Sequence, residues 1–509
     1  MNSIEIRKLG LLLVLALPTV FWLQAATRTE VIATPKLKAV FELLKHTPEK
    51  PILWLSALAG LALAMLLLWL MSLLGKSEFA GSPFRKFLRG TRIVSSHSLK
   101  RKTQERKKQQ VTVAGVPMPT AVETLHLLLS GATGSGKSVL MRGIAFSALQ
   151  RGDRAIVLDP EGDMFSKFSR PRDVLLNPYD ARTKGWSFFN EIRADYDFHR
   201  YALSLVPRGK TAEAEEWAAY GRLLLREVSR KLAMLGTPSV HELFRWTTIA
   251  PPDELYEFLK GTAAESLFVG SSEATRAMSS ARFVLSDKLP EHISMPCGDF
   301  SLRAWLEDPK GGNLFITWRE DMAEALKPLI SAWIDALFVS VLSMPEDENR
   351  RIWAFIDELA SLEKLATLEA ALTKGRKHGL RVVAGLQSTA QLDDIYGRDA
   401  AQTLRSCFRS LVVLGGAKTD PKTCEDMSKS LGEHEVERVQ VSTSSGARGG
   451  GSNTSPRTDR ERVVTASEIA SLPDLTGYVA FSGDRPIAKV ILSPQHFMNR
   501  VPAFEERVA

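Results

Sequence analysis

Short apolar runs separated by helical patterns recur through most of the chain beyond residue 111. The runs are rich in Leu, Val, Ile and Phe, as buried β-strands are. Because helical stretches lie between most of them, the pattern predicts an α/β fold in which helices cover a mostly parallel sheet. The predicted strands are 124–130, 154–158, 312–317, 352–356, 380–386, 410–414 and 478–481, and residues 477–482 and 486–492 are expected to form a late hairpin.

Residues 183–297 interrupt this rhythm, because strand-like runs vanish there and helical patterns dominate. We therefore predict an all-α insertion domain between two parts of one sheet-containing domain, 111–182 and 298–509. The stretch 442–462 is rich in Ser, Thr, Gly and Arg and is expected to be a mobile loop. Transient phosphate contact is left open for its arginines, Arg448, Arg457, Arg460 and Arg462.

Two long apolar runs precede this body, at about 9–26 and 52–74. At about 1.5 Å per residue, each is long enough to cross a hydrocarbon core of about 30 Å. The following stretch, 76–108, carries 11 basic residues, so the positive-inside rule places the C-terminal body in the cytoplasm. We predict a transmembrane domain, 1–75, with two spans, followed by a basic juxtamembrane linker, 76–110.

The first apolar run has a second interpretation. Arg7 and Lys8 before it and the small residues that end it also resemble a secretory signal, whose cleavage would leave the second span in place. A later apolar segment, 329–342, is interrupted by Asp335 and is predicted to be a buried helix rather than a span.

Charge is unevenly distributed over the 509 residues. The formal net charge is +8, but residues 1–110 hold 18 of the 66 basic and 6 of the 58 acidic residues, so the remainder is slightly acidic. The overall basicity therefore comes from the N-terminal region. It indicates the orientation of the chain in the membrane and contact with lipid headgroups, rather than nucleic-acid binding by the body. The 3 cysteines are far apart with no C-x-x-C pair, which excludes a disulfide scaffold and a zinc finger.

A glycine-rich loop follows the first predicted strand and opens a helical pattern. It matches G-x-x-x-x-G-K-[ST], in which backbone N–H groups and a helix N-terminus bind phosphates. Lys137 is expected to reach the β- and γ-phosphates and Ser138 to ligate Mg²⁺, so ATP and Mg²⁺ are the predicted cofactors of a nucleotide-binding domain. The predicted phosphate-binding residues are Gly131, Ala132, Thr133, Gly134, Ser135, Gly136, Lys137 and Ser138.

Polar residues end other predicted strands. Asp357 is expected to hold Mg²⁺ and Glu358 to polarise the attacking water. Gln387 ends a further strand, where it would sense the γ-phosphate or orient water, although an ordinary strand cap gives the same pattern. Asp159 is a weaker candidate, because capping of the turn that follows its strand would explain its position equally well. We expect the glycine loop and the acid pair to lie on adjacent strands and to bind one magnesium-bound triphosphate.

Two residues lie outside these strand ends. Arg376, in the segment 375–379, is a candidate arginine finger that enters a neighbouring subunit's site, with a solvated helix end as the alternative. Trp217 is either a core residue or a stacking residue that faces DNA.

These motifs together resemble the type IV coupling proteins of conjugative plasmids, close to the short TrwB-like members of the TraD/TraG class. The likeness covers nearly the whole chain, and the order and spacing of the motifs are specific although the glycine loop alone is generic. The segments that carry it are 131–138, 159–163, 355–360, 375–379 and 385–388.

The resemblance implies a RecA-like ATPase that forms a homo-hexameric ring at the bacterial inner membrane as a multi-pass protein. It implies ATP-driven transport of single-stranded DNA, and binding of single- and double-stranded DNA without strong sequence preference. Its implied partners are the relaxase of the relaxosome and inner-membrane components of a type IV secretion channel. It also implies that Arg376 acts in trans and that Trp217 lines a central channel. Long family members end in an acidic tail that docks accessory proteins; the sequence shows no such acidic segment, so that mode of docking is not expected.

The principal hypothesis is therefore a coupling ATPase that pumps DNA. The alternative is a nucleotide-gated membrane receptor that recruits the relaxase and pumps nothing. A septal chromosome translocase would have more spans and a long linker, and an ABC transporter would carry a Leu-Ser-Gly-Gly-Gln signature. The active ATPase is favoured by the joint presence of Lys137, Asp357, Glu358 and Gln387.

Overall fold

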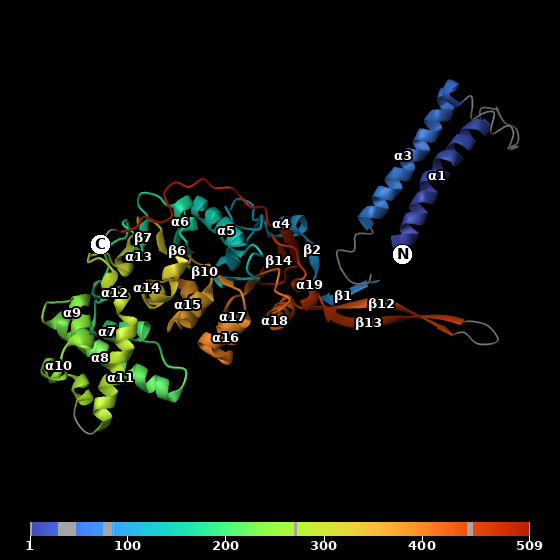
Figure 1. The fold of residues 1–509 in the computed structure, drawn as a ribbon. Helices are drawn as coiled ribbons and strands as arrows, with labels where there is room; N and C mark the ends of the chain where they lie inside the picture. The colour runs from blue at the N-terminus through green and yellow to red at the C-terminus, as the bar shows by residue number, and fades with distance from the viewer. Residues whose placement is uncertain are drawn as a thin grey trace. The chain divides into compact units, whose positions relative to one another are not determined.

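The structure is a computed structural model that describes residues 3–28, 47–74, 84, 86–268, 272–444 and 451–507. The chain divides into two compact units, Met1–Pro83 and Phe84–Ala509. The first contains helices α1 and α3, and the second contains the β-sheets (Figure 1).

Helices α1 (Ser3–Arg28) and α3 (Pro51–Leu74) pack against each other in the first unit. A Cβ atom on Gly60 would lie 2.7 Å from the carbonyl oxygen of Leu17. A glycine is therefore needed there for the two backbones to approach, as is common between membrane helices.

By length and composition, the segment Pro51–Trp69 could cross a membrane. Glu320–Ser343 meets the same test, but most of it is buried in the second unit, where it forms α14 (Ala323–Ser343). This confirms the prediction of a buried helix around Asp335. No other segment of the described residues qualifies, so the first predicted span stays a prediction and a multi-pass topology is not supported.

A ten-stranded sheet organises the second unit. The strands are β2 (Ile93–Ser95), β5 (Leu127–Ser130), β6 (Arg154–Pro160), β7 (Val174–Leu176), β8 (Leu314–Trp318), β9 (Ile352–Ile356), β10 (Leu380–Leu386), β11 (Ser410–Leu414), β14 (Thr476–Ala480) and β15 (Ile487–Ile491). Their order is β2-β15-β14-β11-β5-β10-β9-β6-β8-β7. The seven strands from β11 to β7 are parallel, and β14 is antiparallel to both neighbours. This confirms the α/β class and the mostly parallel sheet.

The first predicted strand is shorter than expected. Residues Thr120–Leu125 form a 3-10 helix, η2, and His126 turns the chain with a φ of +60° before β5 begins. Strands β2 and β7 were not predicted, because three residues are too few to establish a pattern. A small hairpin, β3 (Thr112–Val113) with β4 (Val116–Pro117), precedes η2.

Helices connect most of these strands, and within the described ranges 177–268 and 272–313 the named elements between β7 and β8 are all helical. The limits of the insertion, 183–297, stay a prediction, since Phe84–Ala509 forms one unit. The helices are α4 (Ser96–Thr103), α5 (Lys137–Arg151), α6 (Asp163–Phe168), α7 (Asp195–Leu205), α8 (Ala212–Met234), α9 (Val240–Phe244), α10 (Pro252–Leu259), α11 (Ser272–Lys288), α12 (Pro290–Ser294), α13 (Leu302–Glu307), α15 (Leu368–Lys374), α16 (Thr389–Tyr396), α17 (Arg398–Cys407), α18 (Pro421–Leu431) and α19 (Ala466–Ala470).

The segment expected to be a mobile loop, 442–462, is largely a strand. Strands β12 (Glu433–Ser444) and β13 (Gly451–Arg462) form a long antiparallel hairpin, and β1 (Lys86–Gly90) adds to β12 (Figure 1). Backbone pairing holds the hairpin together despite its polar composition, which is why composition alone misled. Three of its arginines form ion pairs at the surface, Arg457–Asp459, Arg460–Glu433 and Arg462–Glu433, and Arg448 lies outside the described residues. Contact of these arginines with phosphate stays a prediction.

The core fixes α5 against the sheet. Trp353 and Phe355 on β9 are fully buried and stack with their ring planes 9° apart. Met141 and Ile144 on α5 belong to the same apolar cluster. Burial of each such side chain stabilises the fold by about 1.5–3 kcal/mol, so the N-terminus of α5 is held firmly beside the carboxyl ends of the strands.

Candidate active site

The glycine-rich loop links β5 to α5 and is fastened on both sides. Gly131 N donates to the carbonyl of Leu386 (3.2 Å), and Ala132 N donates to the carbonyl of Gly415 (2.8 Å). Gly134 has a φ of +81°, and a Cβ atom there would meet open space. The loop thus presents backbone to an open side, as a phosphate cradle requires.

The Lys137 ammonium folds back onto this loop. Its Nζ donates to the carbonyl oxygens of Gly131 (2.7 Å) and Ala132 (3.2 Å), and the residue is buried. Burial lowers the pKa of Lys137, while the nearby carboxylates of Glu358 and Asp357 raise it. A phosphate group would offer this ammonium a charged acceptor in place of two neutral carbonyls.

The structure brings Ser138 and Asp357 together. The Ser138 hydroxyl donates to Asp357 Oδ2 at 3.1 Å, although 219 residues separate them in the sequence. Burial raises the pKa of Asp357, and the Ser138 hydrogen bond and Lys137 oppose that rise. A hydroxyl and one carboxylate are oxygen donors suited to Mg²⁺, which takes its remaining ligands from water and phosphate.

The expectation that the loop and the acid pair lie on adjacent strands is wrong. Strand β10 pairs with both β5 and β9 and therefore stands between them. Strand order depends on long-range pairing and cannot be read from a local motif. The intervening strand ends at Gln387, whose Oε1 accepts a 2.9 Å hydrogen bond from the Thr133 hydroxyl.

Glu358 directly follows Asp357, and one of its carboxylate oxygens has no hydrogen bond among the described residues. Its Oε1 accepts a long 3.4 Å bond from the N–H of Ala360, and its Oε2 is buried with no hydrogen-bond partner among the described residues. Burial raises the pKa of Glu358, and Lys137 opposes the rise. An unsatisfied buried carboxylate oxygen is costly, and its presence marks a place where a further donor, such as water, fits.

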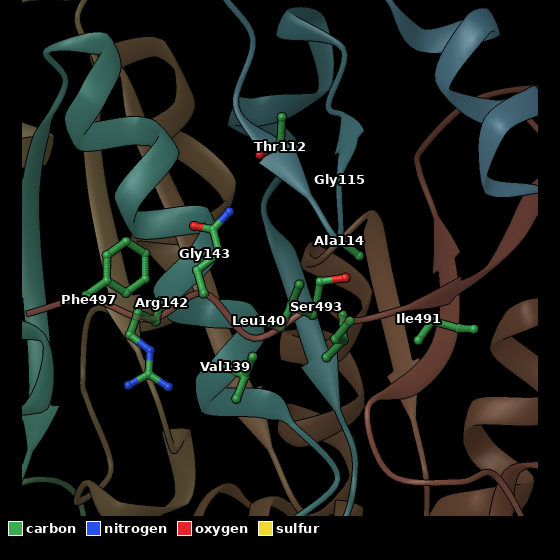
Figure 2. A pocket seen from close by; sticks show the side chains of 12 residues that line it. Thr112, Ala114, Gly115, Val139, Leu140, Arg142, Gly143, Ile491, Ser493 and Phe497 are labelled. Carbon is green, nitrogen blue, oxygen red and sulfur yellow. The ribbon is translucent and has the colours of Figure 1, made fainter.

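A cavity of about 170 Å³ lies along the first turns of α5, just beyond the cradle residues in the sequence (Figure 2). Val139 and Gly143 on α5, the turn between β3 and β4, and Ser493 in the C-terminal segment line it. A Cβ atom on Gly136 would lie 3.0 Å from the side chain of Leu492, so the C-terminal segment also abuts the cradle.

Comparison with known proteins places this site in a family. The family model described as "Type IV secretion-system coupling protein DNA-binding domain" matches residues 110–493. The chain belongs to the type IV secretion-system coupling proteins. Coupling protein TraD of Escherichia coli (strain K12) is 33% identical over 422 residues, which are 79% of this chain and 57% of that protein. The chain therefore spans little more than half the length of this curated relative.

Solved structures of a coupling protein are more similar. Bacterial conjugative coupling protein TrwBdeltaN70 is 68% identical, with a TM-score of 0.81, and the match covers 85% of this chain and 100% of that chain. Plasmid coupling protein TrwB in complex with ADP and Mg²⁺ is 67% identical, with a TM-score of 0.80 and the same coverage. That protein was also solved with a non-hydrolysable ATP analogue and a non-hydrolysable GTP analogue.

Asp159 has a structural role in this coupling protein. It is buried, and its two carboxylate oxygens accept from the N–H groups of Met164 (3.0 Å) and Phe165 (2.6 Å) at the start of α6. Burial raises the pKa of Asp159 to about 7. The weak catalytic interpretation therefore gives way to the capping interpretation.

Arg376 lies far from its own chain's cradle. It is exposed in the 3-10 helix η8 (Gly375–His378) just before β10, whereas Gln387 follows the other end of that strand. Seven residues of strand span about 20 Å. Within the described residues Arg376 has no ion pair, so its guanidinium is available to another molecule.

Trp217 lies near the N-terminus of α8 and is 37% exposed. This argues against the core interpretation and leaves the DNA-facing one as a prediction. The sequence interpretation missed the ion pair of Arg142 with Asp163, whose charges reach Asp357. The acidic segment that begins at Asp159 was the only available signal for it.

Proposed function

We propose that this coupling protein is a DNA-dependent ATPase at the bacterial inner membrane. It links a relaxase–DNA complex to a type IV secretion channel and pumps single-stranded plasmid DNA as a homo-hexamer. Its further partners are the inner-membrane components of that channel. The contact between the Ser138 hydroxyl and Asp357, 3.1 Å apart beside Lys137, is the observation that carries the proposal.

Magnesium-bound ATP would supply the phosphoanhydride bond whose hydrolysis drives transport. Lys137 would exchange its two carbonyl acceptors for phosphate oxygens, and Ser138 with Asp357 would hold the metal. Glu358 would use its free Oε2 to orient water and accept a proton. Gln387, already bonded to Thr133 of the loop, would report the state of the γ-phosphate to β10.

Lys137→Thr tests the ATPase. We expect loss of nucleotide binding, of DNA-stimulated hydrolysis and of plasmid transfer, with membrane insertion intact, because the loop loses its phosphate-binding charge. Lys310→Thr, at an exposed turn, is the matched control. Normal plasmid transfer by Lys137→Thr would contradict the proposal.

Glu358→Gln separates the pump from a nucleotide-gated receptor. It keeps the size of the side chain and nucleotide binding, but it removes the general base, which contributes about 10² to 10⁴ in rate. A pump with this change should transfer no DNA. Continued transfer by a variant that binds but does not hydrolyse ATP would favour the receptor.

A further inference from the structure

A second cavity, of about 320 Å³, opens between the end of α7 and the helices that follow the catalytic strands. Ligand pockets commonly begin at about 300 Å³, so one nucleotide unit has room to enter. Its walls come from three parts of the chain that lie far apart in the sequence. They include Leu203 and Arg208 at and after the end of α7, Lys364 and Leu365 after Glu358, Tyr396 on α16 and Leu404 on α17.

Apolar side chains and two cations line this cavity. Leucine side chains and the Tyr396 ring provide apolar walls, while Arg208 and Lys364 stand among the lining residues. Within the described part of the chain, neither cation has an ion pair, and only Glu369 adds an acidic group to the lining. An apolar cleft flanked by unpaired cations suits a flat base that is joined to a phosphate.

Two walls of the cavity lie on segments that directly follow catalytic residues. Lys364 and Leu365 lie on the segment that follows Glu358, and Tyr396 ends the helix that follows Gln387. The same segment continues into α15, which ends next to Arg376. The main-chain N–H of Leu365 donates to Tyr396 Oη at 3.2 Å, so two of these walls are joined.

The segment after Glu358 is also fastened to α14 and, through it and directly, to helices between β7 and β8. Asp335 on α14 is buried and accepts bonds from the N–H (2.8 Å) and hydroxyl (2.5 Å) of Thr367, and also from Ser204 on α7. Glu363 pairs with Lys288 at the end of α11. A ligand that separates or closes these walls would therefore shift both groups of elements together.

We propose that this cavity binds one nucleotide of single-stranded DNA, with its base between the leucines and Tyr396 and its phosphates on Arg208 and Lys364, and that occupation is transmitted to Glu358, Gln387 and Arg376. The proposal rests on the proposed function, because it assumes that the protein binds DNA. It adds the site at which binding of the DNA strand is coupled to ATP hydrolysis.

The charge part of the proposal is tested by the salt dependence of binding. Fluorescence anisotropy would follow a labelled oligo(dT) on the full chain in detergent. Each phosphate contact to a single strand contributes about 0.7 to the slope of log K against log salt, so Arg208→Gln with Lys364→Gln should lower the slope by about 1.4. Lys310→Gln with Lys429→Gln, both exposed and outside the cavity, should leave it unchanged. Equal slopes for both pairs would overturn the proposal.

The base part is tested by filling the cavity. Ala400 on α17 lines it, and Ala400→Phe occupies the space without changing charge. Because one stacked base contributes about 1–3 kcal/mol, oligo(dT) affinity should fall about 5- to 150-fold with an unchanged salt slope. Stimulation of hydrolysis by oligo(dT) should fall with it, whereas binding of duplex DNA should not change. Unchanged affinity for oligo(dT) would overturn the proposal.

The outcomes also separate this proposal from the proposed function. If the unaltered chain binds no DNA, both fail. If it binds DNA and all variants match it, only the cavity assignment fails. The charge variants alter exposed or partly exposed side chains, so they remain decisive even if Ala400→Phe does not fold.

Discussion

The carboxyl ends and the amino ends of the central parallel strands carry polar clusters of opposite character. We call these two sides of the sheet the carboxyl edge and the amino edge. Helix α5 connects them, with Lys137 and Ser138 in its first turn at the carboxyl edge and Arg151 as its last residue at the amino edge. Strand β10 does the same, because Arg381 lies at its start and Gln387 follows its end. The same two elements therefore serve both edges.

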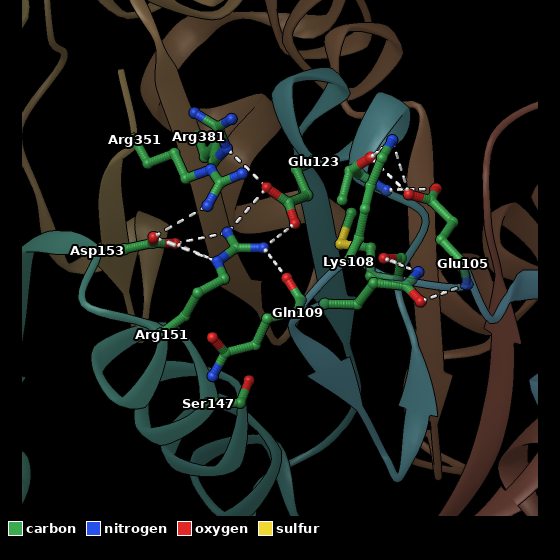
Figure 3. Close-up of polar contacts among 12 residues, drawn as sticks. Glu105, Lys108, Gln109, Glu123, Ser147, Arg151, Asp153, Arg351 and Arg381 are labelled. Carbon is green, nitrogen blue, oxygen red and sulfur yellow. Dashed lines mark hydrogen bonds and ion pairs between the residues drawn. The ribbon is translucent and has the colours of Figure 1, made fainter. Parts of the chain in front are cut away.

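The amino edge carries a buried charge network that joins Glu123, Arg151, Asp153 and Arg381 (Figure 3). Glu123 accepts bonds from Arg151 at 2.6 and 3.0 Å and from Arg381 Nε at 2.9 Å. Asp153 binds Arg151 and also accepts from the indole of Trp353 at 2.8 Å. These four charged side chains are at most 5% exposed. Burial lowers the pKa of Arg151, but the hydrogen bonds and charges of Glu123 and Asp153 outweigh this effect, so the pKa is raised above its ordinary value.

The carboxyl edge leaves bonding capacity unused. Glu358 Oε2 has no partner among the described residues, and Lys137 is held only by carbonyl oxygens. Buried polar groups that are fully satisfied make a structure rigid, whereas unsatisfied ones are kept where a ligand completes them. The charge network at the amino edge therefore stabilises the fold, and Glu358 and Lys137 at the carboxyl edge keep bonding capacity for water and nucleotide.

Arg376 tests this division most severely, because it lies at the amino edge yet is predicted to act in a neighbour's carboxyl-edge site. We expect Arg376→Ala to lower kcat by about 10³ to 10⁵, since an arginine finger stabilises charge that develops on the transferred phosphate. Nucleotide binding by the monomer and the free energy of unfolding should change little. Steady-state hydrolysis and equilibrium nucleotide binding would measure both.

A mixture of variants shows whether the finger acts in trans. Arg376→Ala retains an intact cradle and Lys137→Thr retains an intact finger, so mixed oligomers should regain hydrolysis that neither variant has alone. Lys377→Ala, on the same exposed turn, is the control. Mixed oligomers that form but stay inactive would contradict the assignment.

Glu123→Gln tests the amino edge. The change removes the carboxylate shared by Arg381 and Arg151, which leaves Arg381 with carbonyl partners and Arg151 with Asp153 and the carbonyl of Gln109. Breaking a buried pair costs about 3 to 5 kcal/mol, which urea unfolding followed by tryptophan fluorescence would measure. Hydrolysis per folded molecule should stay near normal. Glu346→Gln breaks the exposed pair with Lys377 and should cost at most about 1 kcal/mol. Equal losses for the two variants would remove the distinction between the edges.

The two edges differ also in how far the sequence predicts them. The cradle residues 131–138 and the pair Asp357–Glu358 are local motifs at strand ends, so their chemistry could be anticipated from a few consecutive residues. Their strand order could not, because β10 enters between β5 and β9 only through long-range pairing.

The amino edge gave no comparable signal. Glu123 and Arg381 are 258 residues apart, and each alone resembles an ordinary surface charge in the sequence. The cavity between α7 and α17 is likewise assembled from distant segments. In the hairpin of β12 and β13, strand pairing overrode a polar composition that is typical of loops. Motif chemistry is local, whereas charge pairing, cavities and strand order are not.

Asp159 sharpens the comparison, because it lies at the carboxyl edge but is bonded like the residues of the amino edge. Its pKa is raised to about 7 by burial, from an ordinary value of 3.8. Between these values the folded protein keeps a proton that the unfolded chain has released. Stability therefore falls as pH rises from about 4 to about 7, and it levels off above that.

Asp159→Asn removes this titration and keeps one oxygen that can accept from Met164 or Phe165. Any loss from the missing second bond is independent of pH. One pH unit corresponds to about 1.4 kcal/mol, so the wild type should gain about 2 kcal/mol relative to the variant between pH 7.5 and pH 5.5. Urea unfolding of both proteins across this range measures the difference, in which the other titrating groups cancel. If the difference in free energy of unfolding stays constant with pH, Asp159 is ionised in the folded protein. Its charge would then act on the site together with those of Asp357 and Glu358.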